Sequence, residues 1–245
     1  LGIMLNLYVI ADTLIVLPLL VLSVMVLLHG GYKLRRNVSL TLFSILVAIW
    51  IVANHLGNDL ATNSEIAVVA NYFVFSCSFA AMVLVMLFAV QLGANKRLIS
   101  LAKVSLPVLG VITVLAATPL VGAGVERQEN IYGVIFGPLV IPYGVALIYM
   151  ITVTLIAIEL GLRHNRGIRH NQLQVVGASL LFALPLVLSV SFILPSLTGL
   201  FWLTEFGVMP LAVLVAALYY SVIRHQLFDV RFVVVRGVAY ACVLA

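Results

Sequence analysis

Long apolar runs separated by short polar breaks repeat along the whole chain. Each run is apolar on every face over about 20 residues or more, the length that a helix needs to cross a hydrocarbon core about 30 Å thick. We therefore predict seven membrane-spanning helices, at residues 5–29, 38–57, 66–92, 98–121, 134–160, 172–195 and 201–223. Transmembrane strands would instead alternate apolar and polar positions over about ten residues. The pattern predicts an all-α polytopic membrane protein whose short connections join antiparallel neighbours in one bundle.

Composition supports this prediction and narrows the class of protein. Hydrophobic residues make up 64% of the 245 positions and charged residues 9%, whereas soluble domains carry about 45–50% apolar and about 25% charged residues. A soluble enzyme, a disordered chain and a nucleic-acid-binding protein are excluded, because none of them can hide so much apolar surface from water. The expected environment is a lipid bilayer.

The positions of the basic residues predict an orientation. Lys and Arg cluster in the first, third and fifth connections and after the last run, at residues 33–36, 96–103, 163–169 and 224–236, and only Arg127 lies on the other side. Four of the eight acidic residues, Asp59, Glu65, Glu126 and Glu129, lie in the other connections. Since cytoplasmic loops carry the excess of Lys and Arg, we predict an outside N-terminus and a cytoplasmic C-terminus. An alternative role for these basic loops is contact with anionic lipid headgroups.

A few polar side chains lie inside the predicted spans, where they are costly and therefore candidates for function. They are Asp12, Asn54, His55, Asn71, Tyr72, Trp202 and Glu205. At 1.5 Å rise per residue, all of them fall in a layer roughly 10 Å deep in the outer part of the bundle. We predict that they line a pocket for a small or lipophilic ligand, reached from outside or from the outer leaflet.

Structural roles are the alternative for these same residues. Tyr72 and Trp202 could belong to an interfacial aromatic belt, and His55 and Glu205 could extend to the headgroups. Asp12 favours the pocket, because its short side chain lies about two turns inside the first span.

Other residues predict packing and no chemistry. Glu159 and Arg163 have the i,i+4 spacing of a helical ion pair, and Gly177 and Gly207 are small residues suited to close helix contacts. The two cysteines lie far apart, the five histidines are scattered, and no H-E-x-x-H, G-x-S-x-G or glycine-rich phosphate loop occurs. We expect no metal, no cofactor and no catalytic residues.

The exit from the last span carries the most individual motif of the chain. Tyr220, Arg224, Leu227, Phe228 and Asp229 match the pattern Tyr-Ala-x-x-Arg-x-x-Leu-Phe-Asp-[Ile/Val], with serine at position 221 in place of the alanine. This segment resembles the point at which the N-terminal seven-transmembrane input region of bacterial sensor histidine kinases leaves the membrane. The motif covers about 15 residues, and the remaining resemblance lies in the number, length and orientation of the spans.

The resemblance implies a sensory input domain, residues 1–223, followed by a signal-relay connector at residues 224–245 that includes the start of a further helix. It implies a cytoplasmic histidine kinase or nucleotide cyclase as output, a two-component system, and a homodimer formed through the cytoplasmic domains. Kinase motifs are absent from these 245 residues, so this chain is not expected to be an enzyme itself. The first residue is Leu1, and an apolar run begins near Ala245, so we expect a piece of a longer product. A plain amphipathic stop is the alternative for the connector.

Two other classes of membrane protein compete with a sensor. A small transporter or channel would be expected to show repeated halves and polar groups near the midplane, and the sequence shows neither feature clearly. A non-catalytic subunit of a membrane complex is equally compatible with the short loops.

Overall fold

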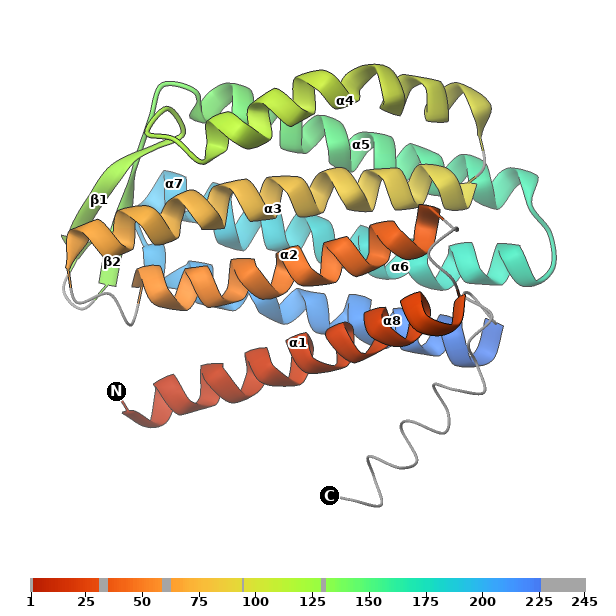
Figure 1. The fold of residues 1–245 in the computed structure, drawn as a ribbon, viewed down its shortest axis with the longest axis horizontal. Helices are drawn as coiled ribbons and strands as arrows, with labels where there is room; N and C mark the ends of the chain where they lie inside the picture. Colours follow the sequence, from red (N-terminus) through yellow and green to blue (C-terminus); the bar gives the residue numbers. More distant parts are fainter. Residues whose placement is uncertain (1, 31–34, 59–62, 94, 129–130, 226–245) are drawn as a thin grey trace.

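A computed structural model describes residues 2–30, 35–58, 63–93, 95–128 and 131–225, with the backbone alone at some helical positions. The chain forms a bundle of antiparallel helices with one β-hairpin at its end (Figure 1). The elements are α1 (Gly2–Gly30), α2 (Arg35–Asn58), α3 (Ser64–Gly93), α4 (Lys96–Ala116), β1 (Gly122–Gln128), β2 (Ile131–Phe136), α5 (Val140–His164), α6 (Ile168–Leu188), a π-helical segment (Ser189–Ile193), α7 (Leu194–Thr198), a 3₁₀ segment (Phe201–Val208) and α8 (Met209–His225).

The long apolar helices indicate a multi-pass membrane protein. In the part of the chain that the structure describes, five helical stretches are long and apolar enough to cross a membrane: Val38–Gly57, Ser64–Gly93, Lys96–Ala116, Val140–His164 and His170–Thr198. Shorter apolar stretches, Asp12–Met25 and Phe206–Leu218, lie in the first and last helical regions.

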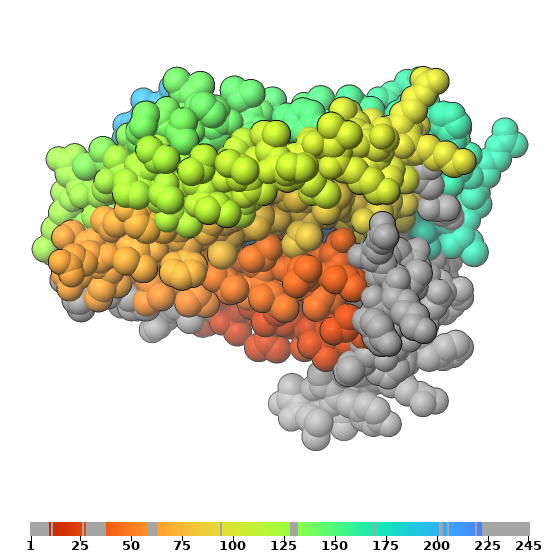
Figure 2. Space-filling model, turned by 45° about the horizontal axis from the view of Figure 1, so that its top comes forward, coloured from red at the N-terminus to blue at the C-terminus, as the bar shows by residue number. Residues whose placement is uncertain are grey.

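Helix α4 shows most clearly that the outer surface of the bundle suits lipid. It lies on the outside of the molecule, beside α3 (Figure 2). Its valines at positions 104, 108 and 114 are 73%, 62% and 69% exposed. Contiguous apolar surface of this kind is rare on soluble monomers and normal where hydrocarbon is the solvent. Asn95 begins α4 by accepting hydrogen bonds from the backbone N–H groups of Arg97 and Leu98.

Helix α3 is the central element, packed against α2, α4, α5 and the hairpin. Its Gly93 lies so close to α5 that an added Cβ would be 2.5 Å from the carbonyl oxygen of Ala157. Likewise, a Cβ at Gly177 of α6 would be 2.4 Å from Cγ2 of Ile158 in α5. The predicted packing role of Gly177 is therefore confirmed, since small residues let the helices approach closely.

The all-α prediction is wrong for residues 122–128 and 131–136, which form the antiparallel strands β1 and β2 with Gln128 opposite Ile131. The predicted fourth span ends early, at Ala116, because the chain turns before Pro119, which lacks the N–H that a helix would need. The predicted fifth span begins late, at Val140. Residues 134–136 are apolar like the helix after them, so hydropathy could not separate strand from span.

The sixth and seventh predicted spans are not continuous α-helices. The π-helical segment interrupts the sixth, and the seventh begins with the 3₁₀ segment, whose backbone packs against the π-helical segment. Gly199, with φ of 72°, ends α7 between them. We call these two packed segments the π–3₁₀ junction.

Antiparallel packing gathers the connections into two chemically different ends (Figure 1). The basic end holds the α3–α4 and α5–α6 connections, with exposed Lys96, Arg97, Arg163 and Arg166. The hairpin end holds the β-hairpin and the start of α3, with exposed Glu65, Glu126 and Arg127. At the basic end, Arg163 Nη2 donates to Glu159 Oε1 at 2.5 Å, which confirms the predicted ion pair.

Candidate ligand site

The sequence-predicted pocket residues do not meet in one place. Asn54 and His55 are neighbours on α2 and therefore point to different sides of this helix, about 100° apart. His55 faces α1, whereas Asn54 lines the interior of the bundle together with Asn71. The structure thus divides the predicted polar layer into two sites near the hairpin end.

The first site is the pairing of Asp12 in α1 with His55 in α2. His55 Nε2 lies within hydrogen-bonding distance of Asp12 Oδ2. The Asp12 side chain is 14% exposed and the His55 side chain 16%. They border an open hollow of about 240 Å³ between the two helices. Each of the two polar side chains therefore has a partner on the neighbouring helix.

The second site is a pair of adjoining cavities inside the bundle. The hairpin-side cavity, about 40 Å³, is bordered by Asn54, Asn71, Tyr132 and Thr204 among others. The central cavity, about 110 Å³, lies deeper, among α2, α3, α5, α6 and α8. The two share part of their lining, namely Trp50, Val74, Phe75, Ser191 and Phe192.

A cluster of aromatic rings surrounds these cavities and connects separate elements. The Tyr143 ring of α5 contacts Phe75 and Phe79 of α3, with centroids 5.7 Å and 5.1 Å away, and Phe192 of the π-helical segment at 5.8 Å. Phe136 of β2 contacts both Phe75 and Phe192, at 6.4 Å and 5.9 Å. These tilted and edge-to-face pairs are favourable geometries for aromatic side chains. The cluster therefore ties the hairpin to the π–3₁₀ junction.

Hydrogen bonding in the cavity lining is uneven. Tyr143 Oη donates to the carbonyl of Phe75 at 3.2 Å and lies 3.1 Å from Ser78 Oγ, so both hydroxyls have partners. Ser191 Oγ, by contrast, is buried and has no hydrogen-bond partner among the described residues. Gly207 allows this arrangement, because a Cβ there would lie 1.8 Å from Ser191 Oγ. The predicted role of Gly207 as a close contact is confirmed.

The remaining predicted site residues lie elsewhere or are only partly described. Tyr72 is half-buried on α3, and its carbonyl accepts a hydrogen bond from Ser76 Oγ at 2.7 Å. Trp202 and Glu205 belong to the 3₁₀ segment and Arg224 to α8, but only their backbone is described. Tyr220 is exposed on α8. The connector residues Leu227, Phe228 and Asp229, with the rest of residues 226–245, lie outside the described residues.

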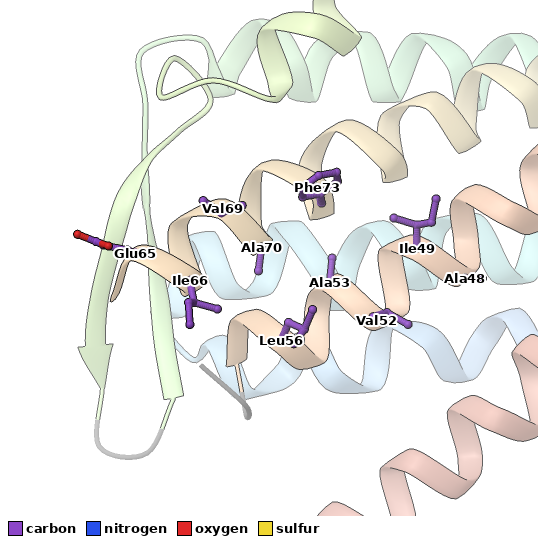
Figure 3. A pocket seen from close by; sticks show the side chains of 10 residues that line it. All are labelled: Ala48, Ile49, Val52, Ala53, Leu56, Glu65, Ile66, Val69, Ala70 and Phe73. Carbon is purple, nitrogen blue, oxygen red and sulfur yellow. The ribbon is translucent and has the colours of Figure 1, made fainter. Parts of the chain in front are cut away.

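A separate, open groove of about 710 Å³ runs along the outer surface between α2 and α3. Figure 3 shows apolar side chains from both helices along its walls and Glu65 at the end nearest the hairpin. Val52 and Phe73 on its walls are 58% and 52% exposed. Its shape and chemistry suit contact with lipid chains, whereas the two interior cavities lie among the helices.

The aromatic cluster and Ser191 are functional candidates that reasoning from sequence missed. Phe and Tyr inside an apolar span have the same hydropathy whether they face lipid or a cavity. Pro185 lies six residues before Ser191, and a proline inside a span indicates irregular backbone nearby. The position of this proline does not show which hydroxyl lacks a hydrogen-bond partner. Within the described ranges, no group of three or more His, Cys, Asp or Glu side chains could hold a metal ion.

Comparisons with known proteins leave the family open. No protein-family model and no curated protein matches the chain. Function must therefore be argued from the site itself.

Proposed function

We propose that the chain is the membrane-embedded sensory input region of a bacterial receptor of the histidine kinase type. In this proposal the bundle crosses the cytoplasmic membrane seven times, with the N-terminus and the hairpin end outside and the basic end in the cytoplasm. The distribution of Lys and Arg supports this orientation. The motif that includes Tyr220 and Arg224 supports the receptor class, and the signal is a small or lipophilic molecule.

One observation carries the proposal: the interior cavities lie directly against the π–3₁₀ junction. π-Helical turns occur often at functional sites, and irregular backbone at membrane depth is tolerated where it is buried in protein or lines a cavity. The 3₁₀ segment continues into α8, which leads toward the proposed relay connector. A ligand that binds one of two arrangements of the junction more tightly would increase the population of that arrangement. Because the 3₁₀ segment continues into α8, the position of α8 would then change as well.

The charge distribution favours a sensor over an ion-coupled transporter. Coupling ions need polar partners near the midplane. In the described part of the chain, no charged side chain lines either interior cavity. The half-buried pair Asp12–His55 lies toward the hairpin end, between α1 and α2.

The first test is the intact mass of the native product that contains this chain. A product much heavier than 26.5 kDa that phosphorylates itself on histidine would support the proposal. A product near this mass that co-purifies with a partner at fixed stoichiometry would favour a complex subunit, and solute uptake into vesicles would favour a transporter.

The site is tested by filling the central cavity. Ala81, which is 6% exposed and borders that cavity, is replaced in Ala81→Leu. The matched control is Ala178→Leu, the same substitution at an exposed position of α6. We expect kinase output to lose its response to the signal in the first variant only, with both variants inserted and folded.

A further inference from the structure

The central cavity is lined mainly by apolar side chains from five helices. Five of the lining residues are each no more than 6% exposed: Val47 of α2, Ala81 of α3, Leu147 of α5, Leu184 of α6 and Leu214 of α8. Among the described residues, no charged side chain borders the cavity. An ionised molecule would lose its hydration there without gaining a counter-charge, which is strongly unfavourable. The site therefore suits uncharged molecules.

The few polar groups of the lining leave little for a ligand or a water molecule to bind. The lining residues with an N–H or O–H in the side chain are Trp50, Ser78, Tyr143 and Ser191. Ser78 Oγ and Tyr143 Oη lie 3.1 Å apart, and both lie within hydrogen-bonding distance of the carbonyl oxygen of Phe75. Ser191 Oγ is buried against Gly207, where an added Cβ would be 1.8 Å away, so it does not open to the cavity.

The indole N–H of Trp50 is the remaining donor of the lining. A buried water molecule needs roughly two to four polar partners, so one indole donor does not hold it. An apolar molecule, by contrast, needs no hydrogen bond and displaces no bound water from such a cavity. The lining thus favours apolar over polar occupants.

The size of the cavity limits what can enter. Its volume is about 110 Å³. An apolar cavity of roughly 150 Å³ in another protein stays dry and binds benzene or xenon. The central cavity is smaller, so it accommodates a xenon atom or a hydrocarbon of a few carbons, whereas a benzene ring requires movement of the walls.

An occupant of this cavity would touch the elements through which a signal is proposed to pass. Phe192 of the π-helical segment borders it, and so do Leu211 and Leu214 of α8. An empty cavity leaves these side chains without contacts on one side, and a molecule that fills it supplies the missing dispersion attraction. Binding would therefore stabilise the arrangement of α8 and the π–3₁₀ junction that the structure shows.

We propose that the central cavity is a dry binding site for small apolar molecules, such as short hydrocarbons, held by dispersion contacts without a hydrogen bond. The inference deepens the proposed function and rests on it only for the meaning of binding as a signal.

The test measures denaturant unfolding of the full-length protein in detergent under xenon, with nitrogen at the same pressure as the reference. A molecule that binds the folded state lowers the unfolding equilibrium constant, roughly ten-fold when its free concentration is about ten times the Kd. Ethane and methanol, which have the same number of non-hydrogen atoms, are compared at equal free concentration. Benzene is the probe for size.

We expect xenon and ethane to stabilise the wild-type protein, and methanol to have no effect. Ala81→Leu fills the cavity and should abolish the effect of xenon, whereas the matched control Ala178→Leu, at an exposed position of α6, should keep it. Leu147→Ala enlarges the cavity. Benzene should therefore stabilise Leu147→Ala and not the wild type, and this variant decides the test if Ala81→Leu does not fold.

Three results would overturn the inference. Equal stabilisation of the wild type and Ala81→Leu by xenon would place the gas in the detergent or in the α2–α3 groove. Equal effects of ethane and methanol would mean that the site does not select apolar molecules, and equal effects of benzene on the wild type and Leu147→Ala would contradict the size limit.

The proposed function fails separately from this inference. A product without kinase output would overturn the proposed function and leave the xenon result intact. Conversely, a histidine kinase whose central cavity binds neither xenon nor ethane would remove only this inference.

Discussion

The pair formed by Asp12 and His55 shows how one polar side chain can determine the contact between two apolar helices. If α1 spans the membrane as proposed, the Asp12 carboxylate needs a partner, because hydrocarbon offers none. His55 provides it from the neighbouring helix, and the α1–α2 contact gains a polar link near the hairpin end. A second link, between the hydroxyls of Ser23 and Ser44, joins the same helices farther along. The two links hold α1 in register against α2.

We expect the Asp12–His55 pair to show strong coupling in a double-mutant cycle. Asp12→Ala and His55→Ala should each destabilise the protein, and the coupling should be about 1–3 kcal/mol, because the residues touch and are largely removed from solvent. The exchange variant Asp12→His with His55→Asp should recover part of the loss. Unfolding free energies in detergent measure all four states.

The exposed ion pair Glu159–Arg163 provides the control for this cycle. The Glu159 side chain is 59% exposed and the Arg163 side chain 68%. Such surface ion pairs contribute only about 0–1 kcal/mol to the free energy of unfolding. Glu159→Ala should change stability by less than about 0.5 kcal/mol. Similar coupling in both pairs would mean that the Asp12–His55 contact adds little to the docking of α1.

At the scale of elements, the π–3₁₀ junction depends on a missing side chain. The added Cβ in Gly207→Ala would meet Ser191 Oγ at 1.8 Å and Ser191 Cβ at 3.1 Å. We expect a loss of about 1–3 kcal/mol, the usual range for overpacking, measured by thermal or denaturant unfolding. The double variant with Ser191→Ala should recover most of it, because only the tighter contact is removed.

Gly110 is the matched control for Gly207. It lies inside α4, and an added Cβ there meets nothing within 4 Å. Gly110→Ala should stabilise the protein by roughly 0.5–1 kcal/mol, because alanine is the better helix former. Equal effects of the two substitutions would show that the junction is looser than these contacts require.

The base of the hairpin gives a second comparison of glycines. A Cβ at Gly137 would lie 2.4 Å from the carbonyl oxygen of Leu120 and 2.5 Å from that of Pro119, and backbone atoms cannot rotate away. At Gly124 the nearest atom, Ile135 Cδ1, is 3.9 Å away. We expect Gly137→Ala to cost about 1–3 kcal/mol and Gly124→Ala less than about 1 kcal/mol. A stability ranking in the opposite order would contradict the hairpin as described.

For the whole molecule, orientation is the prediction with the clearest measurement. In a background with Cys77→Ala and Cys242→Ala, the variants Glu126→Cys and Arg166→Cys place single thiols at the hairpin end and the basic end. A membrane-impermeant maleimide should label Glu126→Cys in intact cells, and Arg166→Cys only after permeabilisation, because basic loops stay in the cytoplasm. The reverse pattern would invert the proposed topology.

Whether the number of crossings is odd requires a separate experiment on the two ends of the chain. Any odd number of crossings, including the seven proposed, puts an epitope tag before Leu1 and a tag after Ala245 on opposite sides of the membrane. Protease protection of sealed spheroplasts should therefore remove the first tag and spare the second. Equal sensitivity of both tags would mean an even number of crossings.

The sequence by itself determined the properties that depend on local composition. Whether a stretch can cross a bilayer follows from its length and apolar content, so the multi-pass character and most helix positions could be predicted without neighbours. The Glu159–Arg163 pair was predictable for the same reason, since i,i+4 residues meet within one helix.

Only the tertiary structure decided which side chains meet. Asn54 and His55 are adjacent in sequence and serve different sites, because rotation about the axis of α2 turns one toward the interior and the other toward α1. The hairpin, the aromatic cluster and the isolated hydroxyl of Ser191 likewise depend on distant segments packing together. Hydropathy gives a lipid-facing phenylalanine and a cavity-facing one the same value, so the direction of each side chain appears only when the helices are packed.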